Sequence, residues 1–149
     1  MIAITPRDIR FDPRAILKCK WGCDWFEGNI KCSSRDLSYK EKVKIIQKYS
    51  RILLLHANDN QKLYKACLAI EKKAFLSGHY LASTIKACGY CRECAVMQKE
   101  NCPHPGKIRP CGQSFGIDVY ATAHHLGLPC EVLQDKTQTP NRYGFVCIE

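Results

Sequence analysis

Five cysteines are concentrated in one short stretch of the chain, ACGYCRECAVMQKENCPHPGKIRPC at residues 87–111. Cys88, Cys91 and Cys94 follow at three-residue intervals, and Cys102 precedes a proline, which gives the pattern C-x2-C-x2-C-x7-C-P. The first two spacings match a known iron–sulfur cysteine run, although the last gap is longer than the usual C-x3-C-P. A turn with thiolates at every third position can reach three iron corners of a cubane. These four cysteines therefore predict a [4Fe–4S] cluster.

Zinc is the competing metal for this stretch. It takes four tetrahedral ligands, typically from two separated pairs, and three overlapping cysteines leave the middle one without a role in such a site. Cys91 and Cys94 could still combine with Cys102 and His104 in a Cys3His site. The spacing and the softness of the thiolates favour the cluster.

A second, looser group follows the pattern C-x3-C-x8-C through Cys19, Cys23 and Cys32. Three ligands leave one position to fill, and Cys111 or a histidine could complete the set. The group predicts a second metal site, at Cys19, Cys23, Cys32 and Cys111, and so allows two clusters in the chain. The alternative is a set of partly buried thiols in an N-terminal loop.

Length and composition indicate a soluble, single-domain protein spanning residues 1–149. Apolar residues make up 46% of the chain and charged residues 25%, as in ordinary globular proteins. The first residues lack a signal-peptide pattern, and the longest apolar run, ILLL at 52–55, is too short to span a bilayer. We therefore expect a cytoplasmic protein without a membrane span. Thiols stay reduced there, so the 11 cysteines point to metal rather than disulfides.

The formal charge of +9 overstates the basic character of the protein. Each cluster with four thiolates carries roughly two negative charges, so one cluster would leave about +7 and two about +5. The basic segment 40–51 lacks aromatic residues suited to stacking bases, so a nucleic-acid partner is not expected. The adjacent His124 and His125 point about 100° apart on a helix and cannot easily share a ligand.

The periodicity of the chain predicts an α+β fold, with a small mixed or antiparallel sheet, two or three helices and cysteine-rich loops. Cys67 falls on the apolar face of a long helix, and Cys130 and Cys147 fall in strands, so we interpret these three as core or edge thiols. The expected helices are 38–49, 60–86 and 114–126, and the expected strands are 51–57 and a hairpin of 129–136 with 143–149.

Several segments resemble, in chain order, a prokaryotic family described as predicted metal-binding proteins, the domain-of-unknown-function family DUF2284. They are KCKWGCDWFEGNIKCSS, YSRILLLH, AIEKKAFLSGHYLA, CGYCRECAVMQKENCPHPGKIRP, GIDVYATAHHLGLPCEVLQDK and NRYGFVCI. The resemblance covers about residues 18–148. It implies metal binding by Cys88, Cys91, Cys94 and Cys102, places the N-terminal cysteines in the same design, and implies a prokaryotic source, often an anaerobe.

Two positions depart from the family pattern. The family usually has two prolines after the third N-terminal cysteine, where this chain has Ser33 and Ser34. It also tends to have serine at the position of Cys111, so this thiol could serve either site as a replacement ligand.

The leading functional hypothesis is a small iron–sulfur protein that transfers electrons as a subunit or partner of a larger redox enzyme, without catalytic residues of its own. Positive charges in the cysteine-rich stretch would favour the reduced cluster and suit an acidic partner. They are Lys86, Arg92, Lys99, Lys107 and Arg109, against Glu93 and Glu100. A zinc-stabilised interaction module without redox activity is the alternative. A third possibility is an enzyme whose cluster, held by the N-terminal trio, leaves one iron open to substrate.

Overall fold

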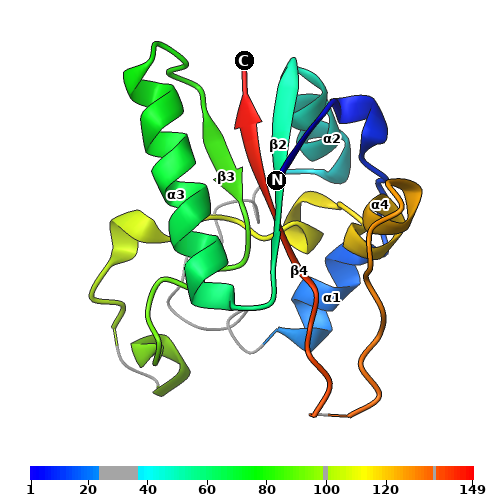
Figure 1. Cartoon of the computed structure of the whole chain (residues 1–149), viewed down its shortest axis with the longest axis vertical. Helices are drawn as coiled ribbons and strands as arrows, with labels where there is room; N and C mark the ends of the chain where they lie inside the picture. The colour runs from blue at the N-terminus through cyan, green and yellow to red at the C-terminus, as the bar shows by residue number, and fades with distance from the viewer. Residues whose placement is uncertain (24–36, 99–100, 136) are drawn as a thin grey trace.

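The computed structural model describes residues 1–23, 37–98, 101–135 and 137–149. These residues contain a four-stranded antiparallel sheet in the order β1-β2-β4-β3 (Figure 1). The strands are β1 (Ile2–Ile4), β2 (Arg51–Ala57), β3 (Ser83–Ile85) and β4 (Arg142–Ile148). The α-helices are α1 (Ala15–Gly22), α2 (Tyr39–Gln47), α3 (Asn60–Leu76) and α4 (Val119–His125). The predicted α+β class is confirmed.

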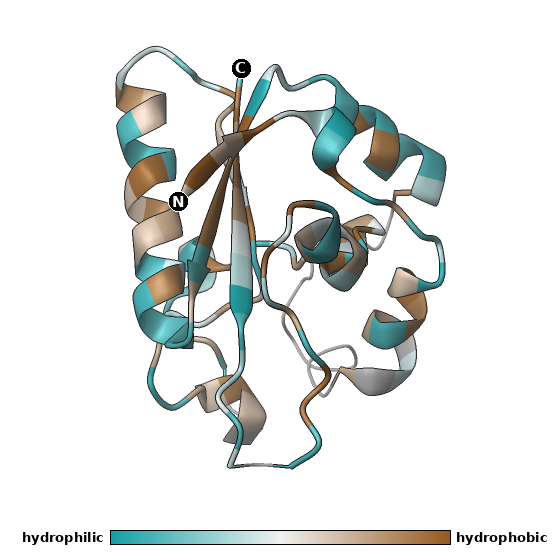
Figure 2. Cartoon of the chain, turned by 45° about the vertical axis from the view of Figure 1, so that its right-hand side comes forward, coloured by the Kyte–Doolittle hydropathy of each residue, from teal (hydrophilic) through white to brown (hydrophobic). Residues whose placement is uncertain are grey.

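The central part of the sheet is buried on both faces. In β4, Phe145 and Cys147 belong to one hydrophobic core, whereas Val146 and Ile148 belong to the other. Successive side chains of a strand point to opposite faces, so a sheet covered on both sides requires an unbroken apolar run. Helix α3 covers one face, and α1, α2 and α4 lie on the opposite side (Figure 1). Figure 2 shows hydrophobic residues along the central strands, as burial on both faces requires.

The sequence predicts two of the strands correctly, but their pairing differs from the expected hairpin. β2 pairs with β4 from Arg51 opposite Ile148 to Ala57 opposite Arg142. β3 occupies the other edge of β4, so β4 has a partner on each side. The segment 129–135 then has no strand to pair with and forms a loop, which corrects the predicted strand over 129–136. Its anchor is a hydrogen bond from the Tyr143 hydroxyl to the Pro129 carbonyl oxygen.

Helix α3 begins as predicted but ends ten residues earlier than its apolar pattern suggests, at Leu76 rather than residue 86. The Asp59 side chain caps its start by accepting a hydrogen bond from the Lys62 backbone N–H. At the other end, Gly78 has a φ of 99°, in the left-handed region that glycine tolerates and that terminates helices. The released segment returns to the sheet and forms β3 within the predicted helix.

The other helices show where capping chemistry is a reliable signal. A capping box of Ser38 and Glu41 starts α2 near the predicted position, and Gly127, with a positive φ, follows the end of α4. Helix α4 begins later than predicted, because Asp118 caps it and Ser114 instead lies in a 3-10 turn. The short 3-10 turns are η1 (Pro6–Asp8), η2 (Ala95–Gln98), η3 (Pro105–Lys107) and η4 (Gln113–Phe115).

In the N-terminal region that the structure describes, β1 and α1 form. Helix α1 packs against η4 and so brings Cys19 next to the segment that follows the cysteine-rich stretch. Among the described residues, none of the helices combines the length and apolar character needed to cross a bilayer.

A half-buried ion pair ties α3 to β3 and to the end of the cysteine-rich stretch. The Glu71 carboxylate accepts hydrogen bonds from the Arg109 guanidinium and, at 2.7 Å, from the Thr84 backbone N–H. Burial raises the pKa of Glu71, but the hydrogen bonds from Arg109 and Thr84 outweigh it, so the pKa lies below its ordinary value. The carboxylate is therefore ionised in the folded protein at neutral pH and stabilises it.

We predict that Glu71→Gln lowers the free energy of unfolding at pH 7 by about 2–3 kcal/mol, because charge-assisted hydrogen bonds are lost. The folded-state pKa is depressed, so the contribution is complete above the ordinary glutamate pKa and disappears as the pH falls through the lower value. Urea denaturation of both chains at pH 7 and pH 3, with the exposed Glu93→Gln as control, measures this. A penalty that is absent at pH 7, or equal at both pH values, contradicts the prediction.

Candidate metal centre

The cysteine-rich stretch forms a closed loop between β3 and the segment that leads to η4. We define the cysteine loop as residues 86–110, of which the structure describes all but 99 and 100. A 2.7 Å hydrogen bond from the Lys86 backbone N–H to the Pro110 carbonyl oxygen closes its base. The turns η2 and η3 lie inside the loop. The two ends are thus fixed at the edge of the sheet, while the cysteines lie on the part that projects beyond it.

Cys88, Cys91, Cys94 and Cys102 all line one cavity of about 160 Å³, and each is half-buried. The structure therefore brings together the four residues that the sequence predicts as ligands of the first site. The other lining residues come from the cysteine loop and from the first residue of α3; they are Asn60, Gly89, Tyr90, Arg92, Ala95, Val96, Pro103 and His104.

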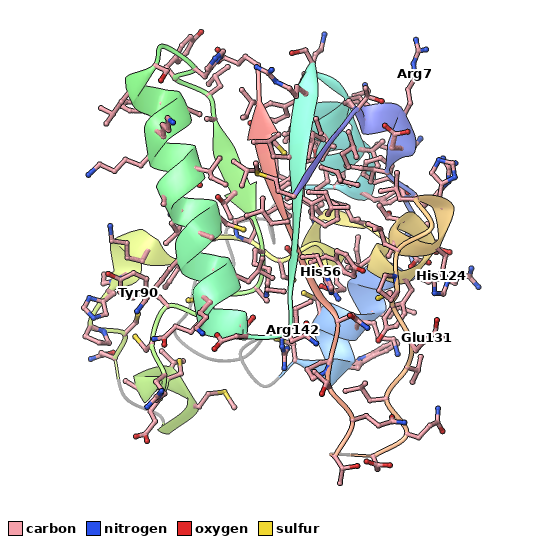
Figure 3. The ribbon with its side chains drawn as sticks, viewed as in Figure 1. Arg7, His56, Tyr90, His124, Glu131 and Arg142 are labelled. Carbon is pink, nitrogen blue, oxygen red and sulfur yellow. The ribbon has the colours of Figure 1, made fainter. Side chains whose placement is uncertain are left out.

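The first turns of α3 hold the cysteine loop in place. Gln61 donates a side-chain hydrogen bond of 2.9 Å to the Tyr90 carbonyl oxygen, between two of the cavity cysteines. The Tyr64 hydroxyl donates one of 2.6 Å to the Lys107 carbonyl oxygen, after the fourth cysteine. The Tyr90 ring meets the His104 ring edge-on, with ring centroids 5.1 Å apart. Tyr90 lies on the α3 side of the molecule (Figure 3). The helix thus contacts the loop on both sides of the cavity.

Gly89 is required where the loop passes closest to α3. A Cβ atom at this position would lie 2.3 Å from the Asn60 side-chain nitrogen Nδ2 and 2.9 Å from the Asn60 backbone carbonyl oxygen. Glycine is the residue that permits such a close approach of two backbones. The sequence analysis missed this role, although a glycine between two candidate ligands is a signal for it.

Lys86 is a buried ammonium at the base of the cysteine loop, with 7% of its surface exposed. Its Nζ donates hydrogen bonds to the Asn60 side-chain oxygen at 2.7 Å and to the Ala87 carbonyl oxygen at 3.2 Å. Burial lowers the pKa of Lys86 to about 8. Nearby cysteines oppose this decrease through their negative charge when ionised; they are Cys67, Cys111 and Cys88. Lys86 therefore lies within electrostatic range of both predicted metal sites.

Fewer of the positive charges in the cysteine loop are exposed at the surface than the sequence suggests. Lys86 is buried and Arg109 is paired with Glu71, so neither presents its charge to a partner. Arg92, which lines the cavity, and Lys107 are exposed. Lys99 and Glu100 lie outside the described residues.

The thiols around the cavity are close enough to influence one another. Burial raises the pKa of Cys91, and the negative charges of Cys88, Cys102 and Cys94 raise it further. Yet among the described residues, no three His, Cys, Asp or Glu side chains form a group arranged to hold a metal ion. A single zinc ion needs its four ligands in one compact tetrahedron, whereas a cubane distributes its ligands over four iron corners. The four thiols at the cavity are donors that soft metal ions and iron–sulfur clusters both accept.

The structure brings together two of the four cysteines predicted for the second site. The Cys19 and Cys111 sulfur atoms lie 3.6 Å apart, on α1 and just after the cysteine loop. Cys23 is half-buried at the C-terminal end of α1, and Cys32 lies outside the described residues. The assignment of all four as ligands stays a prediction.

The other cysteines lie in the hydrophobic cores, as expected. Cys67 and Cys147 have no exposed surface, and burial raises their pKa to about 11 and about 12, so both remain protonated thiols. Cys130 is buried in the loop that replaces the predicted strand.

The two histidines of α4 make separate contacts, His124 with the Cys130 carbonyl oxygen and His125 with Arg10.

Thiols gathered around one cavity in an α+β fold are typical of a metal-binding protein. The model of the family described as "Predicted metal-binding protein (DUF2284)" matches residues 2–148, so the chain belongs to this family. No curated protein and no solved structure matches the chain. Membership of the family supports metal binding and leaves the kind of metal to be inferred from the site.

We predict that Gly89→Ala displaces the cysteine loop from α3 and lowers the free energy of unfolding by about 1–3 kcal/mol, as overpacking does. Part of the bound metal is lost as well, because two cavity cysteines flank this position. Gly106→Ala is the matched control in the same loop, since a Cβ atom there has no neighbour within 4 Å. Urea denaturation and metal content per chain measure both effects. Equal results for the two variants would show that the close approach to Asn60 is unimportant.

Proposed function

We propose that the protein is an iron–sulfur protein that holds a [4Fe–4S] cluster on Cys88, Cys91, Cys94 and Cys102 and transfers electrons. The observation that carries the proposal is that these four thiols line one cavity. The ferredoxin-like spacing of the first three and the proline after the fourth support the same assignment. The family description supports the metal, and the cluster type is our inference.

When bound, such a cluster takes up and releases an electron with little movement of its ligands. The chain contributes a rigid support, because both ends of the loop are tied to the sheet and Gln61 and Tyr64 hold its two sides. The buried Lys86 ammonium contributes a fixed positive charge near Cys88, which favours the reduced cluster.

The position of the cavity supports exchange of electrons with another protein. All four cavity cysteines are half-buried rather than enclosed in a core, so a cluster there lies near the surface. The exposed Arg92 and Lys107 belong to the same loop, and Lys65 of α3 lies 5.8 Å from the Tyr90 ring centroid. These charges suit an acidic surface on a redox partner or on a larger redox enzyme in the cytoplasm.

A zinc-stabilised interaction module is the second candidate, and one observation favours it. His104 lines the same cavity as Cys91, Cys94 and Cys102, so the donors of a Cys3His zinc site are also gathered there. Such a site would hold the loop without redox activity. The two candidates differ in metal content, in colour and in their response to a reductant.

We predict that the anaerobically purified chain is brown, contains about four irons and four sulfides per cavity cluster, and bleaches with dithionite. Cys94→Ala removes one ligand and most of the iron and visible absorption. Cys130→Ala, which removes a buried thiol outside the cavity, leaves both unchanged and controls for cysteine loss. Iron, sulfide and zinc analysis with visible spectra measures the outcome. A colourless protein with stoichiometric zinc, even after reconstitution with iron and sulfide, contradicts the redox proposal.

A further inference from the structure

The contact between Cys19 and Cys111 joins parts of the chain that are 92 residues apart. Cys19 lies on α1 with 7% of its surface exposed, and Cys111 lies at the start of the segment that forms η4. Helix α1 and η4 pack against each other, so the approach of the two sulfur atoms follows from the fold.

The distance between the two sulfur atoms discriminates between kinds of site. It is 3.6 Å, far longer than the bond of about 2.05 Å in a disulfide. Two thiolates that bind one tetrahedral ion at about 2.3 Å lie about 3.8 Å from each other. In a cubane each iron takes one thiolate, so the ligands diverge from separate corners. The observed spacing therefore matches two ligands of the same ion and argues against a second cubane on these cysteines.

The surroundings of Cys111 suit a thiolate ligand. The Ser114 backbone N–H donates a hydrogen bond of 3.3 Å to its sulfur, and the Ser114 hydroxyl donates one of 2.8 Å to its carbonyl oxygen. Hydrogen bonds to a ligand fix its orientation and stabilise its charge. The buried ammonium of Lys86 adds positive charge on the side of the cysteine loop.

We propose that Cys19 and Cys111 are two ligands of a single tetrahedral metal ion of the zinc class, in a structural site separate from the cavity of the cysteine loop. Binding releases the proton of each thiol and joins α1 to η4 through the metal. Cys23, the residue that directly follows α1, lies four residues after Cys19 in the chain and is a candidate for a third ligand. Water or another donor completes the tetrahedron.

This site does not depend on the cluster proposed for the cysteine loop, and the experiment separates the two. The full-length chain with Cys88→Ser, Cys91→Ser, Cys94→Ser and Cys102→Ser lacks all four loop ligands and serves as the parent. It is stripped of metal and titrated anaerobically with Co²⁺, a coloured probe for tetrahedral thiolate sites, and then with Zn²⁺. We expect about one Co²⁺ per chain with thiolate-to-cobalt absorption, displaced by one Zn²⁺.

Adding Cys111→Ser to this parent should weaken Co²⁺ binding by about 100-fold or more, since even loss of a partner that only orients a ligand costs 10–100-fold. Adding Cys130→Ala should leave it unchanged. If the Cys111→Ser chain does not fold, X-ray absorption of the cobalt-loaded parent decides, with at least two sulfur neighbours at about 2.3 Å expected. A parent that binds no Co²⁺, a Cys111→Ser variant with unchanged affinity, or a Cys19–Cys111 disulfide in the isolated protein overturns the proposal. Wild-type iron and sulfide contents, measured in parallel, test the loop cluster independently.

Discussion

Burial of β2 and β4 on both faces is the constraint on which the rest of the structure depends. Their apolar sequences, RILLLHA and RYGFVCI, leave no face for solvent, so helices must cover each side. Helix α3 takes one side, and the remaining helices lie on the other (Figure 1). The interior is thereby occupied by side chains that pack, and the described cysteines of the two predicted sites lie outside the sheet, in the cysteine loop, next to η4 and on or just after α1. The thiols that do enter the cores, Cys67 and Cys147, are kept protonated by their burial.

The same arrangement explains why the two cysteine groups lie near each other. β3 ends at Ile85, and Lys86 begins the cysteine loop with its backbone bonded to Pro110, directly before Cys111. One short segment therefore fixes the cavity cysteines on one side and the contact with α1 on the other. The buried Lys86 ammonium lies at the base of the cysteine loop, where its hydrogen bonds to Asn60 and to the Ala87 carbonyl oxygen offset the cost of its burial.

The sequence predicted the features whose signals are local. The strand over 51–57, the helix that begins after Ser38 and the gathering of four cysteines at one cavity all depend on residues close in the chain. The failures arose where distant partners decide the outcome. The helix predicted over 60–86 does not continue after Leu76, because Gly78 adopts a positive φ and residues 83–85 pair with the open edge of β4 as β3. The contact between Cys19 and Cys111 could be suggested from cysteine count but not located, because it depends on how α1 packs against η4.

The most direct test of the central claim is a crystal structure of the anaerobically purified protein, with anomalous diffraction recorded on both sides of the iron absorption edge. The account predicts a compact group of iron peaks inside the cavity, with Cys88, Cys91, Cys94 and Cys102 each bound to a different iron. A single peak that appears at the zinc edge between Cys91, Cys94, Cys102 and His104 would contradict it and establish the zinc module instead.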